Sequence, residues 1–227
     1  MVIFHGSNII VDKPSYGVGR PDNDYGSGFY CTEDIELAGE WAATGIAGGF
    51  VNEYELDTDS LNIIYLNNGD YHILNWLALL MNNRVVRVTS PVEKRGLEYV
   101  ITHFLPDIEN ADVIVGYRAD DSYFSFSRAF LSNSITLQQL SHAMKYGDLG
   151  LQVMLRSKSA FSSISFTCSY PVDGNEYYPK RMARDRAART AFQELLEKED
   201  RTGLYLSDIM RKEIIDDDSG IFKIISG

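Results

Sequence analysis

Tyr25-Gly26-Ser27-Gly28-Phe29-Tyr30-Cys31-Thr32 joins two closely spaced glycines to a short run of β-prone residues. The glycines favour a turn, whereas Phe29-Tyr30-Cys31 predicts a brief strand. Thr32 can then cap a helix whose first turn holds Glu33 and Asp34, because acidic side chains are favourable at the positive end of a helix. This octapeptide therefore predicts a turn, a strand and a helix in close succession.

The segment before the octapeptide predicts a strand followed by a long loop. Val2 to His5 is a β-prone run that ends at Gly6, Ser7 and Asn8. Residues 8–28 are then rich in glycine, proline, asparagine and aspartate, which are turn-forming residues. Because loops of this length in a compact domain usually have a functional role, we expect one here.

The residues after the octapeptide alternate between helical and strand patterns, which predicts an α+β fold. Ala38 and Trp41 share one face of the first helix. Thr136 and Gln139 have the spacing of a capping box at the start of a later helix. Further strands are expected at residues 50–56, 62–66, 112–117, 151–155 and 164–170, and further helices at 73–81, 97–105, 137–146, 179–199 and 204–215.

The pattern changes from mixed strands and helices to helix alone near Tyr178. We therefore expect residues 1–175 to form the main domain and residues 176–227 to form a C-terminal helical extension packed on it. The sequence shows no internal repeat, so a solenoid is not expected.

Composition is typical of a folded globular protein. Of the 227 residues, 44% are hydrophobic and 23% are charged, which allows a sizeable core. The formal net charge of −11 makes duplex nucleic acid or an anionic membrane a poor default partner. The sequence contains neither a secretory signal nor a run approaching the ~20 apolar residues of a membrane span. We therefore expect a cytoplasmic protein without a membrane partner.

The cysteines and histidines do not have the spacing of a metal site. Cys31 and Cys168 lack a C-x-x-C arrangement, and we expect both to stay reduced. His72, His103 and His142 are scattered along the chain, so no metal is expected. The common phosphate-loop, dinucleotide-binding and nucleophile-elbow motifs are also absent from the sequence.

Four segments together resemble the NAD⁺ pocket of the ADP-ribosyltransferase superfamily, in the branch that includes diphtheria toxin and the poly(ADP-ribose) polymerases. They are His5-Gly6-Ser7, the octapeptide around Tyr30, Trp41 eleven positions after Tyr30, and Gly150-Leu151-Gln152-Val153-Met154-Leu155. The order His, Tyr, Trp, Gln follows the order in the family. The resemblance covers roughly residues 2–170 and implies an α+β fold with a split β-sheet core and surrounding helices.

The resemblance implies how the first of these residues would hold the nicotinamide end of NAD⁺. His5 would hydrogen-bond a ribose hydroxyl, and Gly6, with Ser7 beside it, would offer its backbone to the nicotinamide carboxamide. Tyr30 and Trp41 would enclose the nicotinamide, a flat cationic ring that aromatic faces attract by stacking and by cation–π contact.

Gln152 lies where the family usually has its catalytic glutamate. Glutamine can orient a ribose through a hydrogen bond, but it supplies no full negative charge and cannot act as a general base. The resemblance therefore implies transfer of a single ADP-ribose and disfavours polymer synthesis. Asp120 or Asp121 is our candidate for an acid that compensates, and the alternative for both is a turn and helix cap before Ser122.

Arg20 lies in the long loop between the first two motifs, where the family places a segment that covers the dinucleotide. We expect its guanidinium to bind the pyrophosphate through two parallel hydrogen bonds. The alternative is a surface arginine paired with a nearby aspartate.

These residues lead to three functional hypotheses. The first is a mono-ADP-ribosyltransferase that uses NAD⁺ as substrate and modifies an unknown protein or nucleic-acid acceptor. The second is an NAD glycohydrolase, in which water replaces the acceptor. The third is a non-catalytic module that binds NAD⁺, ADP-ribose or a protein partner. The layout is also similar to an uncharacterised bacterial family sometimes found beside antitoxin-like genes, which implies by analogy a toxin-like effector with an antitoxin-like partner.

Overall fold

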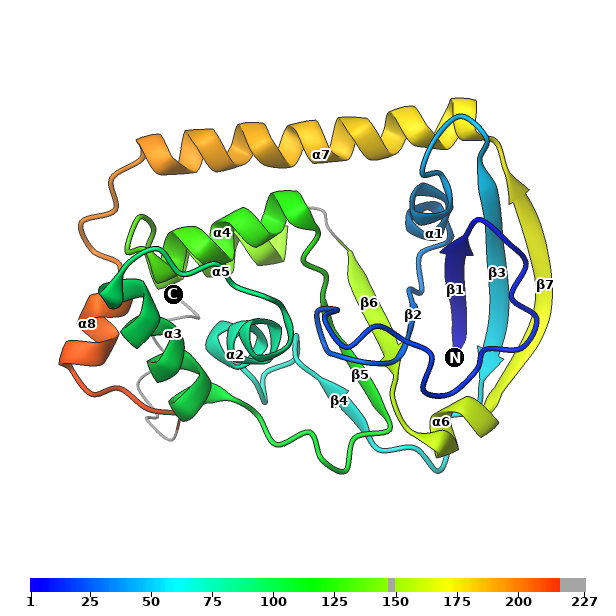
Figure 1. Cartoon of the computed structure of the whole chain (residues 1–227), viewed down its shortest axis with the longest axis horizontal. Coiled ribbons are helices and arrows are strands. Elements are labelled where there is room, and N and C mark those ends of the chain that lie inside the picture. Colours follow the sequence, from blue (N-terminus) through cyan, green and yellow to red (C-terminus); the bar gives the residue numbers. More distant parts are fainter. Residues whose placement is uncertain (147–149, 217–227) are drawn as a thin grey trace.

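Two β-sheets form the centre of the computed structural model, which describes residues 1–146 and 150–216 (Figure 1). The three-stranded sheet is antiparallel and has the order β1-β3-β7. The four-stranded sheet has the order β2-β6-β5-β4, in which only β4 and β5 are parallel. The strands are β1 (Val2–Ser7), β2 (Phe29–Cys31), β3 (Gly49–Leu56), β4 (Ile63–Tyr65), β5 (Val113–Tyr117), β6 (Leu151–Leu155) and β7 (Ile164–Val172). The expected α+β fold with a split sheet is confirmed.

The helices are distributed unequally over the two sheets (Figure 1). Helices α2 to α5 and α8 gather beside the four-stranded sheet, α1 lies beside the three-stranded sheet, and α7 runs along one side of the whole molecule. Their bounds are α1 (Ile35–Ala42), α2 (Ile73–Asn83), α3 (Pro91–Phe104), α4 (Asp121–Leu131), α5 (Leu137–Tyr146), α6 (Lys158–Ser162), α7 (Gly174–Glu197) and α8 (Leu206–Arg211).

Strand alternation divides the core into connected clusters. Along β6, Val153 and Leu155 pack between the two sheets with Ile3 and Tyr54. Met154 points to the opposite face and packs with the helices, around the fully buried Trp76 of α2. Because side chains alternate along a strand, Gln152 shares the helix-facing side with Met154. This placement directs Gln152 away from the core between the sheets.

The two sheets are joined at one backbone bridge and separate beyond it. The Phe4 N–H donates to the Thr32 carbonyl at 2.7 Å, and the Thr32 N–H donates to the Phe4 carbonyl at 2.9 Å. If this antiparallel register continued, Gly6 would lie opposite Tyr30, yet no bridge joins these two described residues. The opening between the sheets therefore begins beside the two motifs that the resemblance singled out.

Helix α1 packs tightly on β1 because Gly6 has no side chain. A Cβ atom at Gly6 would lie 1.9 Å from the Ala38 carbonyl oxygen and 2.9 Å from the Cβ of Trp41. The glycine thus fixes the position of the helix that carries Trp41. The cap of this helix differs from the prediction, because Asp34 instead of Thr32 accepts the free N–H groups of Glu36 and Leu37.

Other element boundaries also differ from the sequence pattern. Helix α7 begins five residues before Pro179, capped by Asp173, and the proline lies inside the helix. Helix α4 was not predicted, although Asp120 caps it well. The Thr136–Gln139 capping box is confirmed, with bonds of 2.9 and 3.2 Å.

The predicted domain boundary near residue 175 falls inside α7. One continuous helix therefore joins the two predicted units. None of the helices within the described part of the chain is long and apolar enough to cross a lipid bilayer.

Candidate functional site

A cavity of about 550 Å³ lies where the two sheets separate, and four of the predicted residues line it. They are His5 of β1, Tyr30 of β2, Trp41 of α1 and Gln152 of β6. Residues of the loop between Val11 and Gly28 form another wall. Four segments that are distant in sequence therefore meet at one site, and the long loop lies beside it.

His5 is held in one tautomer by the backbone of β2. Its Nδ1 lies 2.7 Å from the Tyr30 carbonyl oxygen, which can only accept a hydrogen bond. Nδ1 therefore carries the proton, and Nε2 of the neutral ring is a hydrogen-bond acceptor. Burial lowers the pKa of His5, which favours the neutral ring near pH 7. The residue can thus accept a hydrogen bond from a hydroxyl group of a ligand.

Tyr30 is fixed by its hydroxyl group at the glycine turn. The hydroxyl donates to the Gly26 carbonyl at 2.7 Å and accepts from the Tyr25 N–H at 3.0 Å. Burial raises the pKa of this hydroxyl, so it stays protonated. Tyr30 is therefore suited to provide a rigid ring face and is not suited to act as a base.

Trp41 combines a half-buried ring with an unsatisfied donor. Its Nε1 atom is buried and has no hydrogen-bond partner among the residues that the structure describes. Leaving such a donor unpaired costs about 1–3 kcal/mol, which an acceptor atom of a ligand or a water molecule would offset. The Arg118 guanidinium lies 5.3 Å from the centroid of the indole, so this ring already interacts with a flat cation.

Arg118 is a cavity residue that the sequence reasoning did not assign. Its side chain is only 19% exposed, and it pairs with Asp120 at 3.5 Å. Burial lowers the pKa of Arg118, an effect opposed by Asp120 and Asp24. Its position directly after the strand that ends at Tyr117 was the available signal, because the end of a strand can place a side chain in a site.

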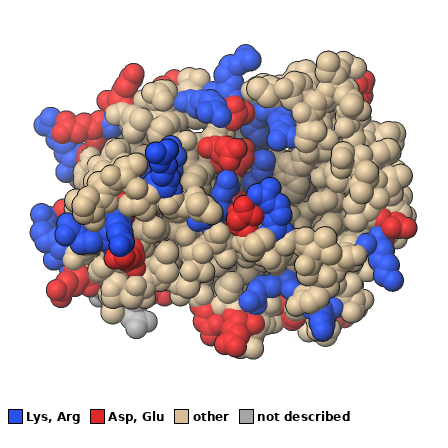
Figure 2. Space-filling model, in the orientation of Figure 1, with Lys and Arg blue, Asp and Glu red and all other residues tan. Residues whose placement is uncertain are grey.

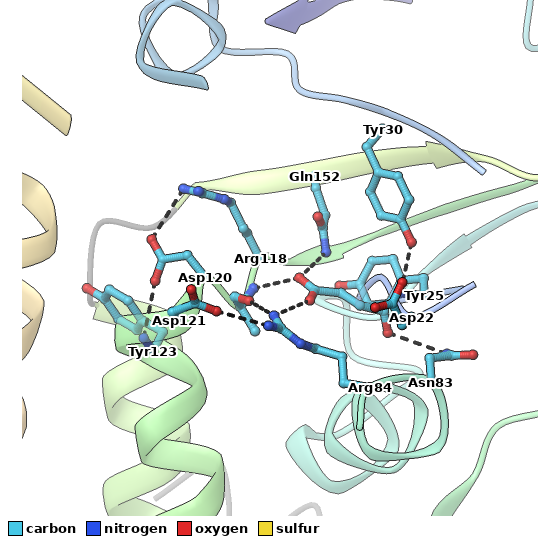
Figure 3. A network of polar contacts seen from close by, with 12 residues as sticks. Asp22, Tyr25, Tyr30, Asn83, Arg84, Arg118, Asp120, Asp121, Tyr123 and Gln152 are labelled. Carbon is cyan, nitrogen blue, oxygen red and sulfur yellow. Dashed lines mark hydrogen bonds and ion pairs between the residues drawn. The ribbon is translucent and has the colours of Figure 1, made fainter. Parts of the chain in front are cut away.

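Gln152 is fixed by a buried carboxylate. Its Nε2 donates to the Asp24 Oδ2 at 3.0 Å and lies 3.4 Å from the Tyr117 carbonyl oxygen. Figure 3 shows the amide nitrogen of Gln152 directed toward the polar network around Arg84, with Tyr30 on the same side. The position of the nitrogen leaves the carbonyl oxygen Oε1 as the atom that can contact a ligand.

Asp24 joins the loop to three other parts of the chain. Besides Gln152, its carboxylate accepts from the Ala119 N–H at 2.8 Å and from Arg84 at 3.0 Å. Its side chain is 9% exposed and lines the cavity. Burial raises the pKa of Asp24, while the Ala119 N–H, Arg84 and Gln152 act in the opposite direction.

The two acids proposed from sequence lie at the beginning of α4, beside the cavity residues and not among them. Asp120 caps the helix by accepting from the Tyr123 N–H and pairs with Arg118. Asp121 pairs with Arg84 at 3.1 Å and has a side chain that is 90% exposed. Figure 3 shows both acids on the far side of Arg84 and Arg118 from Gln152. Asp24 is thus the acid in direct contact with Gln152.

The remaining predicted residues occupy different surroundings. Arg20 lies outside the cavity wall, with a side chain that is 77% exposed and pairs with Asp22 at 2.7 Å. The Ser7 hydroxyl donates to the Ile9 carbonyl and accepts from Asn52, which anchors the start of the loop. Gly6 has its N–H and carbonyl directed away from β3, as strand alternation after the Phe4–Thr32 bridge requires. Its backbone is therefore oriented toward the opening between the sheets.

The cavity contains basic groups although the chain as a whole is acidic. Lys13 and Arg118 both line it, and an anionic ligand would contact them on entry. Figure 2 shows acidic and basic side chains close together around the recessed centre of this face. A ligand with both cationic and anionic parts would fit such a mixed surface.

The comparisons with known proteins identify a family and no characterised relative. Searches of curated proteins and of solved structures returned no match. A family model described as "Protein of unknown function (DUF3990)" matches residues 1–166, which include both sheets up to β7 and all the cavity residues described above. The chain therefore belongs to the DUF3990 family.

Proposed function

We propose that this protein binds NAD⁺ in the cavity between the sheets and transfers a single ADP-ribose to a macromolecular acceptor. The observation that carries the proposal is that His5, Tyr30, Trp41 and Gln152 line one cavity although they come from four separate elements. The resemblance to ADP-ribosyltransferases selected these four residues without any knowledge of their positions.

The nicotinamide ring would lie between Tyr30 and Trp41. Tyr30 is held rigidly by its hydroxyl group, and Trp41 already carries a flat cation, Arg118, near its face. We expect Arg118 to move toward the pyrophosphate when the pyridinium takes its place. The backbone of Gly6, which points into the opening, would bind the carboxamide.

The reacting ribose would lie between His5 and Gln152. His5 Nε2 and Gln152 Oε1 are both acceptors, so each can take a hydrogen bond from a ribose hydroxyl. The bond between nicotinamide and C1′ of the ribose then breaks, and its electron pair leaves with the nicotinamide. The acceptor's nucleophile bonds to C1′ and loses its proton to solvent or to a base of the acceptor. The acceptor class, protein or nucleic acid, is part of the proposal that the assay below identifies.

The decisive experiment follows both products of NAD⁺ cleavage. The purified protein is incubated with a cell lysate and NAD⁺ labelled in its adenylate part, and released nicotinamide and labelled macromolecules are measured together. Labelled protein or nucleic acid supports transfer. Nicotinamide without labelled macromolecule indicates NAD glycohydrolase activity, and NAD⁺ binding in calorimetry without nicotinamide indicates a binding module. A protein that neither binds nor cleaves NAD⁺ contradicts the proposal.

Variants of Tyr30 connect the activity to this cavity. Tyr30→Ala removes the ring and should abolish labelling, whereas Tyr30→Phe keeps the ring and should retain it. Tyr65→Ala, on the partly exposed edge strand β4, is the matched control and should label as the wild type does. Thermal unfolding of each variant separates loss of binding from loss of fold. The toxin-like role and the antitoxin-like partner stay predictions from the resemblance.

A further inference from the structure

We propose that Asp24 is the acidic positioning residue of this site, which holds Gln152 with its carbonyl oxygen toward the ribose and places a negative charge behind it. The inference rests on the proposed function and extends it to a residue that the resemblance did not select. It explains how a site with glutamine in place of glutamate can keep its chemistry.

The orientation of the Gln152 amide follows from its neighbours. The Asp24 carboxylate and the Tyr117 carbonyl can only accept hydrogen bonds, and they lie 3.0 and 3.4 Å from the same amide nitrogen. A reversed amide would place two oxygen atoms against each other at 3.0 Å. Oε1 must therefore point away from Asp24, and both residues line the cavity.

The carboxylate of Asp24 is itself held without freedom to turn. The Ala119 N–H and the Gln152 amide both bind Oδ2, at 2.8 and 3.0 Å, while Arg84 binds Oδ1 at 3.0 Å. These bonds connect the end of the long loop to β6 and to the segment after β5. Asp24 thus transmits the position of the loop directly to the amide of Gln152.

The charge of Asp24 is only partly neutralised by Arg84. Arg84 also pairs with Asp121 at 3.1 Å, so these three ionised side chains together carry one negative charge. A carboxylate that accepts a hydrogen bond from the amide nitrogen draws positive charge toward it and makes Oε1 a stronger acceptor. Negative charge near the ribose stabilises the cation-like sugar formed as nicotinamide leaves.

The arrangement predicts the effect of exchanging the two groups. In Asp24→Asn, an amide replaces the carboxylate, and Gln152 loses both its charged partner and its reason to point Oε1 at the ribose. In Gln152→Glu, two carboxyl groups face each other and one must bind a proton. The double variant Asp24→Asn/Gln152→Glu restores one donor and one acceptor in the opposite order, with the negative charge on residue 152.

The test measures kcat and KM for nicotinamide release from NAD⁺ in the wild type and in these three variants. We expect Asp24→Asn to lower kcat about 100-fold, with KM changed by less than about 3-fold, because the interaction acts on the developing charge. The double variant should recover to within about 10-fold of the wild-type kcat. Asp22→Asn makes the same chemical change two residues earlier in the loop, at an acid that pairs with the exposed Arg20, and should leave kcat unchanged.

Each outcome separates this inference from the proposed function. If the wild type releases nicotinamide and Asp24→Asn does so equally fast, the role of Asp24 is wrong and the proposed function stands. A folded double variant that stays as slow as Asp24→Asn also overturns the inference, because the polarity of the pair would then be irrelevant. If the wild type neither binds nor cleaves NAD⁺, both proposals fall. Thermal unfolding without NAD⁺ is measured for every variant, and if Asp24→Asn does not fold, the double variant compared with Gln152→Glu decides the question.

Discussion

Removing the indole ring of Trp41 should weaken NAD⁺ binding and spare the binding of ADP-ribose. Trp41 lines the cavity on the side of α1, and Gly6 fixes the position of that helix. ADP-ribose has the pyrophosphate and both riboses of NAD⁺ but lacks the nicotinamide. A comparison of the two ligands therefore isolates the contact between the indole and the pyridinium.

The expected magnitude follows from the cation that the ring already carries. A cation–π contact contributes about 0.5–1 kcal/mol when exposed and about 2 kcal/mol or more when desolvated. Since the pyridinium must displace Arg118 from the ring, only the difference is gained, although stacking of two flat rings adds to it. We estimate a net contribution of about 1–2 kcal/mol, which corresponds to roughly a 5- to 30-fold increase in Kd for Trp41→Ala.

Titration calorimetry at low temperature measures both ligands, and fluorescence provides a second readout. The chain has two tryptophans, and Trp76 is fully buried in α2 with its N–H bound to the Tyr117 carbonyl. NAD⁺ should therefore quench mainly Trp41, and Trp41→Phe should bind NAD⁺ with little loss while the quenching disappears. Equal weakening of NAD⁺ and ADP-ribose by Trp41→Ala, or no weakening of either, would refute the stacking role.

Three further predictions concern groups around the cavity. Arg118→Met should weaken both NAD⁺ and ADP-ribose about 10- to 100-fold in calorimetry because charge-assisted hydrogen bonds to the pyrophosphate are lost, and an unchanged Kd for ADP-ribose would exclude this contact. Burial lowers the pKa of His5, so the unfolded chain binds the proton first and the free energy of unfolding should fall as pH drops below about 6.5. His5→Gln should reduce this slope in urea titrations, and an identical slope would contradict the assignment. Arg184→Met leaves Glu40, which is 7% exposed, without its two bonds of 2.8 and 2.9 Å and should cost about 3 kcal/mol in urea unfolding, whereas Glu40→Gln/Arg184→Met should recover most of that loss.

Local patterns were sufficient to predict most of the elements. The alternation in β6 and the capping box before α5 depend on neighbouring residues only, and both are confirmed. Helix α4 escaped prediction because its aromatic and serine residues have weak helical propensity, and packing against the core stabilises it instead. The early start of α7 at Gly174 escaped for a related reason, since Pro179 was taken to mark the first turn.

The acidic partner of Gln152 could not be derived in the same way. Asp24 and Gln152 are separated by 128 positions, so only the tertiary fold brings them together. Sequence reasoning selected Asp120 and Asp121 because they end a strand, and they occupy the start of the next helix. The same limit applies to the basic groups, because Arg20 and Arg118 are equally polar in sequence and differ only in burial.

The energetics of the Asp24 network argue against a cavity that has lost its chemistry. Burying an aspartate raises its pKa and costs stability at neutral pH, and a buried ion pair is often no more stable than apolar residues of similar volume. A site without function would be expected to lose such a group, since nothing would offset its cost. Here the carboxylate is held by Arg84, a backbone N–H and Gln152, at the wall of an open cavity that also contains an unpaired indole donor. Perturbed pKa values and unsatisfied donors that occur together in a cavity are typical of sites where a ligand supplies the missing partners. Substitution of glutamate by glutamine at position 152 is therefore better explained as a change in which residue carries the charge than as its removal.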